Sequence, residues 1–176
     1  EQGVLFSQVV EEARAIGVVW NFFPVADVNS NPVNPIINTR AYSEDPQQAG
    51  ALAAAYIRTS RQYGLLTTAK HFPGHGDTST DSHVEAARVV GDRKRLETVE
   101  LRAFRSAFEA GVDTVMVGHV TVPALDPDPR AVASTSRPVI TGLLKQQMKF
   151  EGLVVPDAMD MAALTRLYPA SSGLAG

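Results

Sequence analysis

The sequence DPQQAGALAAAYIRTSRQYGLLTTA, residues 45–69, contains a complete helix-to-strand unit. Asp45 followed by Pro46 predicts a helix start, because Asp is a favoured N-cap and Pro is favoured at the first helical position. The Ala-rich segment that follows predicts a helix that ends at Gly64. Residues 65–69 then form an apolar run of strand length. A helix that ends at glycine and leads directly into an apolar strand is typical of α/β folds with a parallel sheet.

The same pattern recurs along the whole chain. Further strands are expected at residues 18–23, 114–117 and 153–155. Further helices are expected at residues 5–16, from an N-cap at Asp92 to Gly111, at 138–148 and at 160–168. Four strand–helix units with a long loop after each strand place the ligand site at the C-terminal ends of the strands.

Length and composition exclude several classes of protein. The chain has 176 residues, of which 44% are apolar and 20% are charged, and this is ordinary for one globular domain. The net charge is −3 and there is no Lys/Arg run, so we expect no nucleic-acid partner. The absence of cysteine excludes disulfides, thiol nucleophiles and Cys-based zinc sites. There is no apolar run of roughly 18 residues, so we expect no membrane segment.

The termini give an expectation about completeness. The chain begins with Glu1 rather than Met and has no visible signal peptide. We therefore expect that an N-terminal part is missing, and the compartment stays open.

Histidines cluster after the predicted strands. All four histidines follow the end of a strand, and three of them lie in one loop, KHFPGHGDTSTDSH at residues 70–83. In the first interpretation this loop binds a metal ion, with ligands from His71, His75, Asp77, Asp81 and His83. Its spacing matches no standard zinc motif, and Pro73 and Gly74 disfavour a helix there.

Two other interpretations of the loop remain. Asp81 and His83 are two residues apart, and a carboxylate bonded to one ring nitrogen makes the other nitrogen a better base. The pair is therefore suited to acid–base chemistry. The third interpretation is a solvated loop rich in turn-forming residues.

Three further residues have two interpretations each. Asp157 directly follows the last apolar strand, where it is either a helix N-cap or a carboxylate that points into the site. Arg40 is either a substrate-binding cation or the partner of a nearby carboxylate. Asp27 either orients substrate hydroxyls or forms turns in the Asn/Pro-rich loop.

Four segments together resemble the β-N-acetylglucosaminidase branch of glycoside hydrolase family 3. They are NFFPVADVNSNPVNPIINTRAYSEDP at residues 21–46, KHFPGHGDTSTDSH at 70–83, VMVGHVTVPALD at 115–126 and GLVVPDAMDM at 152–161. They occur in the family order and span most of the chain. The Asp-Ser-His element at residues 81–83 is the part that is specific to this branch.

The resemblance implies a (β/α)8 barrel. With about four strand–helix units present, residues 1–176 are expected to be a single, partial catalytic barrel domain. It also implies a retaining glycosidase that removes terminal β-linked N-acetylglucosamine from a glycan or a muropeptide, without a metal or cofactor. The missing half of the barrel would be needed for a complete site.

Residue roles follow from the same resemblance. Asp157 is the expected nucleophile, and His83, oriented by Asp81, is the expected acid and base. The residues implied to hold or border the sugar are Lys70, His71, Arg40, His119, Met159 and Asp27.

The sequence departs from the family pattern in two ways. Pro156 stands where a Thr or Ser usually precedes the nucleophile. The chain is also shorter than a complete barrel, which takes about 250 residues. Four alternatives therefore stay open: a phosphorylase or a β-glucosidase of the same family, a metal-dependent barrel hydrolase, and an inactive sugar-binding fragment.

Overall fold

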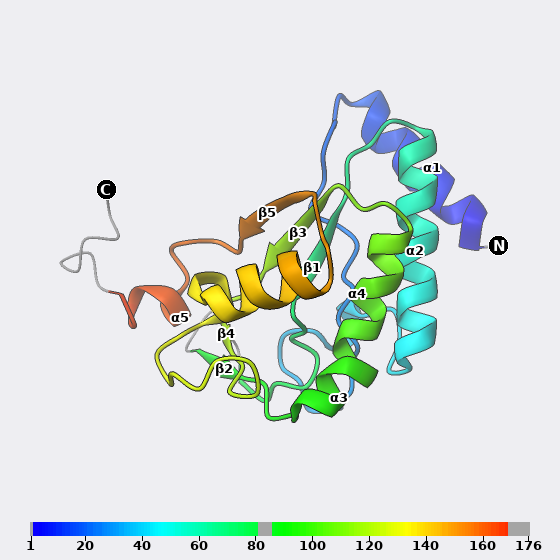
Figure 1. Cartoon of the computed structure of the whole chain (residues 1–176). Coiled ribbons are helices and arrows are strands. Elements are labelled where there is room, and N and C mark those ends of the chain that lie inside the picture. The colour runs from blue at the N-terminus through cyan, green and yellow to red at the C-terminus, as the bar shows by residue number, and fades with distance from the viewer. Residues whose placement is uncertain (1, 81–85, 169–176) are drawn as a thin grey trace.

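A computed structural model describes residues 2–80 and 86–168. Its centre is a parallel sheet of three strands, β1 (Thr68–Phe72), β3 (Thr114–Val117) and β5 (Leu153–Pro156), in the spatial order β1-β3-β5. Helices lie in each connection between these strands (Figure 1). Because strands that are successive in this series are also neighbours in space, the arrangement agrees with the predicted partial (β/α)8 barrel.

A fourth segment runs beside β1 without forming a regular strand. Trp20 and Val25 each make an isolated parallel bridge to the β1 side of the sheet. The prediction of a regular strand at residues 18–23 is therefore wrong. Pro24 lies between the two bridges and has no N–H to donate, which interrupts a regular ladder. The strand predicted at residues 65–69 begins three residues later, at Thr68.

The helices begin largely where the capping residues predict. They are α1 (Gln2–Ala15), α2 (Pro46–Gln62), α3 (Arg93–Thr98), α4 (Glu100–Glu109), the π-helix η3 (Pro138–Gln147) and α5 (Ala162–Thr165). Asp45 accepts a hydrogen bond from the N–H of Gln48, and Asp92 accepts one from the N–H of Arg95, each at 2.7 Å. Both predicted N-caps are confirmed. The helix expected after Asp92 is divided at Val99, where α3 ends and α4 begins.

Helices α1, α2 and α4 lie side by side along one side of the sheet (Figure 1). Gly50 permits the close approach of α2 to α4, because a Cβ at this position would lie 2.8 Å from Oγ of Ser106 and 3.1 Å from Cα of Ala103. Beneath the helices, Phe72 of β1 packs edge-on against Phe104 of α4, with 5.2 Å between the ring centres. None of the helices among the described residues is long and apolar enough to cross a membrane.

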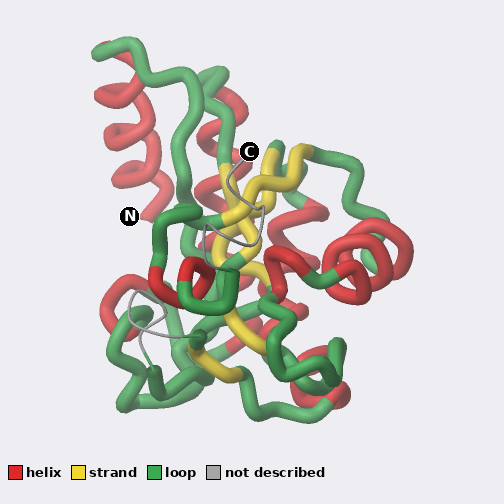
Figure 2. The backbone as a smooth tube through the Cα atoms, turned by 90° about the vertical axis from the view of Figure 1, so that its left-hand side faces the viewer, coloured by secondary structure: helices red, strands yellow, loops and turns green. Residues whose placement is uncertain are grey.

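Short elements lie beyond the C-terminal ends of the strands. A second sheet pairs β2 (Ala87–Arg88) with β4 (Val120–Thr121), and Figure 2 shows it beyond one end of the main sheet. The 3-10 helices η1 (Asn38–Arg40) and η2 (Ala133–Thr135) belong to the long loops. These loops carry most of the residues that the sequence marks as candidates.

Candidate active site

A polar hollow of about 160 Å³ lies at the C-terminal ends of the strands. Four of the candidate residues line it, namely Arg40, Lys70, His71 and Asp157. They come from three loops or strands that are far apart in the sequence. The parallel arrangement brings them together, because the ends of neighbouring parallel strands meet at one edge of the sheet.

Asp27 lies beneath the hollow, with 1% of its surface exposed. Its Oδ2 accepts a hydrogen bond from the backbone N–H of His71 at 3.1 Å and lies 2.7 Å from the ring Nδ1 of the same residue. Its Oδ1 accepts from the backbone N–H of His75 at 2.6 Å. Because a carboxylate only accepts, Nδ1 of His71 must carry the hydrogen, which leaves Nε2 as the other polar atom of this ring.

Burial and charge act in opposite directions on Asp27. Burial alone raises its pKa, but the nearby His71 and His75 and the hydrogen bonds to them hold the pKa below its ordinary value of 3.8. Burial lowers the pKa of His75. The result is a buried, ionised carboxylate that fixes the backbone and one ring of the 71–75 loop.

Two cationic side chains share the hollow. Burial lowers the pKa of Lys70, and the charge of Arg40 lowers it further, while Asp157 and Asp27 raise it. The Arg40 side chain is anchored by a hydrogen bond from Nη1 to the carbonyl of Ile36 at 3.0 Å. A pocket that combines such cations with a carboxylate offers several donors to the hydroxyl groups of a bound ligand.

Asp157 is positioned by the end of β5. Its N–H donates to the carbonyl of Val117 at 3.0 Å, and its Oδ1 accepts from the N–H of Ala158 at 2.8 Å. The helix-capping interpretation of Asp157 finds no support, because α5 starts at Ala162, and its N-cap, Met161, makes no side-chain capping bond. Asp157 instead contributes to the wall of the hollow.

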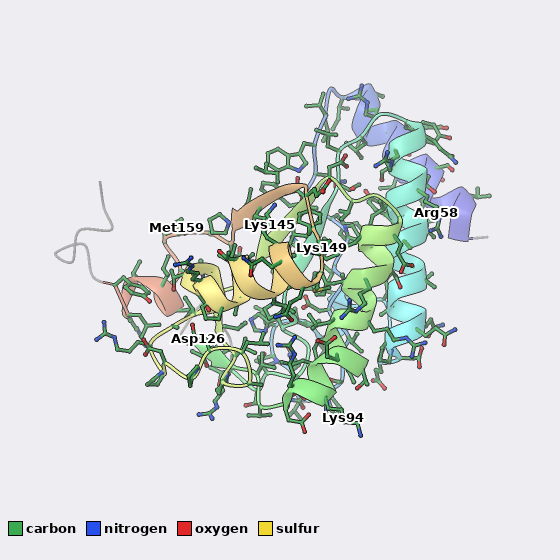
Figure 3. The ribbon with its side chains drawn as sticks, viewed as in Figure 1. Arg58, Lys94, Asp126, Lys145, Lys149 and Met159 are labelled. Carbon is green, nitrogen blue, oxygen red and sulfur yellow. The ribbon has the colours of Figure 1, made fainter. Side chains whose placement is uncertain are left out.

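His119 and Met159 are placed differently from these residues. His119 is completely buried, and both of its ring nitrogens have partners in the protein: Oγ of Ser134 lies 2.7 Å from Nδ1, and the carbonyl of Ala158 lies 3.0 Å from Nε2. Met159 is 54% exposed and lies in the loop after β5 (Figure 3). It lines a separate apolar hollow of about 330 Å³ beside β5, together with Pro156 and other residues.

The candidate acid–base pair follows β1 in the sequence. Asp81 and His83 lie outside the described residues, as does Ser82 between them. Earlier in the same loop, Oγ1 of Thr78 lies 2.7 Å from Nδ1 of His75. Within the described ranges, no group of three or more His, Cys, Asp or Glu side chains is arranged to hold a metal ion.

Four more residues line the hollow, and three of them were assigned no role from the sequence. Phe22, Ile36 and Met116 contribute apolar surface to it, and His75, considered there as a metal ligand, also lines it. Phe22 is 51% exposed, and it stands beside Asn21 in the first of the four motif segments. No signal in the sequence marks this residue, because Phe22 lies in an apolar run that predicts a strand, and its exposure is visible only in the structure.

The chain is similar to known glycosidases along nearly its whole length. The family described as "Glycosyl hydrolase family 3 N terminal domain" matches residues 5–172. "Beta-hexosaminidase A" of Pseudoalteromonas piscicida is 36% identical over 92% of this chain and 29% of its own length. "Beta-N-acetylglucosaminidase/beta-glucosidase" of Cellulomonas fimi is 37% identical over 93% of this chain and 30% of its own length. The chain thus spans about a third of these relatives.

Solved structures agree in fold. A glycoside hydrolase family 3 beta-N-acetylglucosaminidase from Paenibacillus has a TM-score of 0.92 and 39% identity, over 95% of this chain and 32% of that one. The structure of a beta-glucoside phosphorylase has a TM-score of 0.89 and 30% identity, over 96% of this chain and 32% of that one. These matches confirm the predicted fold class, a part of a (β/α)8-type barrel.

Proposed function

The chain belongs to glycosyl hydrolase family 3, and from this premise we propose that the protein is a retaining glycosidase that removes terminal β-linked N-acetylglucosamine. The observation that carries the proposal is the position of Asp157. A carboxylate at the end of a barrel strand faces a hollow with Lys70, Arg40 and His71 around it. Relatives named as hexosaminidases support the sugar specificity.

In the proposed first step, Asp157 attacks the anomeric carbon of the sugar. The bond to the leaving oxygen breaks through an oxocarbenium-like transition state, and a covalent glycosyl-enzyme forms. His83, oriented by Asp81, gives its proton to the leaving oxygen. In the second step His83 removes a proton from water, which then attacks the anomeric carbon and releases Asp157.

The remaining residues bind and orient the sugar. Lys70 and Arg40 donate hydrogen bonds to its hydroxyl groups, and Nε2 of the neutral His71 ring accepts one. Asp27 keeps the His71 ring in one orientation through the 2.7 Å contact with Nδ1. The sugar comes from an N-acetylglucosamine-containing glycan or muropeptide, and a histidine base places no second anion beside an anionic leaving group.

One observation favours a second candidate. The structure of a beta-glucoside phosphorylase shares the fold with a TM-score of 0.89. In that reaction inorganic phosphate replaces water as the acceptor in the second step. A neutral histidine would repel phosphate less than a carboxylate base would.

The test is release of the aryl group from an aryl N-acetyl-β-glucosaminide and from the matching β-glucoside, with the full-length protein. We expect faster release from the acetamido sugar, no release with Asp157→Ala and strongly reduced release with His83→Ala. Asp160→Ala is the matched control, since Asp160 is exposed in the same loop and does not line the hollow. No release from either sugar, or full activity in Asp157→Ala, would overturn the proposal.

Two additions separate the alternatives. An increase in rate with added inorganic phosphate, together with a sugar 1-phosphate product, would identify a phosphorylase. Loss of activity with a chelator, restored by a divalent cation, would identify a metal-dependent hydrolase. Sugar binding without turnover would leave a binding protein.

A further inference from the structure

His119 follows β3 by two residues and is completely buried. It is absent from the wall of the hollow that Asp157 lines. A buried imidazole needs partners for its nitrogens, and here both partners are protein groups rather than ligand atoms. His119 therefore has no polar atom left to bind a substrate.

The two partners determine what the ring does. The carbonyl of Ala158, 3.0 Å from Nε2, only accepts, so Nε2 carries the hydrogen and donates it. In the neutral ring Nδ1 then accepts from the hydroxyl of Ser134, 2.7 Å away. This pair of bonds fixes both the ring orientation and the tautomer, as a partner on the second nitrogen does for functional histidines elsewhere.

His119 binds the carbonyl of Ala158, the residue that directly follows the proposed nucleophile, Asp157. The N–H of Asp157 is fixed by the carbonyl of Val117, and the N–H of Ala158 donates to Oδ1 of Asp157 itself. The next carbonyl, that of Ala158, accepts from His119 and, at 3.2 Å, from the N–H of Met161. The bond from Asp157 to Val117 and the bond from His119 to Ala158 both tie this turn to the end of β3, the first through the backbone and the second through a side chain.

We propose that His119 and Ser134 are positioning residues that fix the turn 157–161, and with it the carboxylate of Asp157, relative to the end of β3. This inference rests on the proposed function, because it assumes that Asp157 is the attacking group. A bond to the turn acts on the geometry of attack rather than on sugar binding. Loss of the bond is expected to lower kcat with little change in KM.

Two substitutions of His119 form a matched pair. A glutamine amide reaches about as far as Nε2, whereas an asparagine amide reaches only as far as Nδ1. In the full-length protein His119→Gln keeps a donor for the Ala158 carbonyl, while His119→Asn keeps a polar partner for Ser134 alone. We expect His119→Asn to lower kcat about 10- to 100-fold, within the range for a small misplacement of a reacting group, with KM changed less than about threefold. His119→Gln should recover most of this loss.

Ser134→Ala provides a test that does not depend on the folding of the His119 variants. The ring keeps its bond to Ala158 but loses the group that sets its orientation, so we expect kcat to fall about threefold with KM unchanged. Wild-type kcat in both Ser134→Ala and His119→Asn would overturn the inference. Equal losses of kcat in His119→Asn and His119→Gln would also overturn it, since that pattern indicates packing alone.

The same experiment separates this inference from the proposed function. If the wild-type protein releases no aryl group, or if Asp157→Ala is fully active, the proposed function itself fails. If the wild type is active and Asp157→Ala is inactive, but the His119 and Ser134 variants behave as wild type, only the positioning role fails. Circular dichroism and thermal unfolding of each variant establish that the compared proteins are folded.

Discussion

Asp27 is the single carboxylate that organises the 71–75 loop, since it accepts from two backbone N–H groups and from one imidazole ring. Asn at this position keeps the shape but turns one accepting oxygen into a donor that faces another donor. We expect Asp27→Asn to lower the free energy of unfolding by about 2–4 kcal/mol, because a buried hydrogen-bonded charge network loses its satisfied partners. Denaturant unfolding of the full-length protein measures this loss.

Asp45→Asn is the matched control for that substitution. Asp45 is an exposed N-cap, and Asn caps a helix as well as Asp does, so the change in the free energy of unfolding should be within about 0.5 kcal/mol.

The stabilisation by Asp27 depends on pH in one direction. The pKa of Asp27 is held below 3.8, so its stabilisation is present above about pH 4 and is lost as the pH falls below that value. Equal stability of wild type and Asp27→Asn at neutral pH would contradict this account.

At the scale of elements, Gly76 determines how closely two loops approach. A Cβ on Gly76 would lie 1.8 Å from the carbonyl oxygen of Val28, which is far inside van der Waals contact. We expect Gly76→Ala to separate the loops, to destabilise the protein by about 2–4 kcal/mol and to reduce activity. Gly142 in η3 is the control, because a Cβ there meets nothing within 4 Å, and Gly142→Ala should stabilise by about 0.5–1 kcal/mol. Thermal unfolding of both variants compares the two outcomes.

Glu100 lies beneath the 71–75 loop, at the start of α4. Burial raises the pKa of Glu100 to about 7. The charge of Arg95 lowers this pKa and the charge of Asp77 raises it. Its Oε1 lies 3.6 Å from Nη2 of Arg95, and that guanidinium group also pairs with Asp77 at 3.1 Å. The loop backbone at Gly74 packs over the carboxyl-bearing side chain.

This environment predicts a pH-dependent stability. The folded protein keeps the proton on Glu100 up to a pKa of about 7, whereas the unfolded chain releases it near the ordinary pKa of 4.5. The stabilisation is therefore fully present below about pH 4.5 and is lost as the pH rises through about 7. We expect the free energy of unfolding to fall by about 1–3 kcal/mol over this pH range, and Glu100→Gln should remove the fall. Unfolding curves between pH 4.5 and 8 measure it, with the more exposed Glu97→Gln as the control that leaves the fall in place.

Local signals predicted the helices well and the strands less well. The N-caps at Asp45 and Asp92 and the helix-ending glycines Gly64 and Gly111, both with positive φ, were readable because each depends on a few neighbouring residues. The segment 18–23 was not, because an apolar run gives no information about how regularly it pairs with a distant strand. Tertiary hydrogen bonding determines that pairing.

In the candidate site too, some features could be predicted from the sequence and others depend on tertiary contacts. That Lys70 and Asp157 would meet was predictable from their positions after parallel strands, although their roles stay predictions. The contacts of His119 with Ser134 and Ala158 cross 15 and 39 residues of sequence, and no spacing pattern encodes them. Residues that act through such contacts are visible only in three dimensions.

At the scale of the whole molecule, the sheet has two open edges among the described residues. The segment that contains Val19 bridges only to Leu66 and to Lys70 of β1, and β5 pairs only with β3. Apolar side chains are exposed at both edges, with Val19 at 60% and Leu153 at 55%. Open, apolar strand edges are templates for pairing with another chain, whereas a closed barrel has none.

We therefore expect the 176-residue chain, expressed by itself, to associate at roughly micromolar concentrations, as exposed apolar strands do. Leu153→Lys places a charge on the open edge of β5 and should shift the chain toward monomer. Val33→Lys is the control, because Val33 is even more exposed but lies in a loop away from any strand edge. Light scattering coupled to size exclusion, with binding of an apolar dye, measures the association. A monomeric wild-type chain that binds no dye would show that the edges are not association sites, and equal effects of the two lysines would attribute association to general apolar exposure instead.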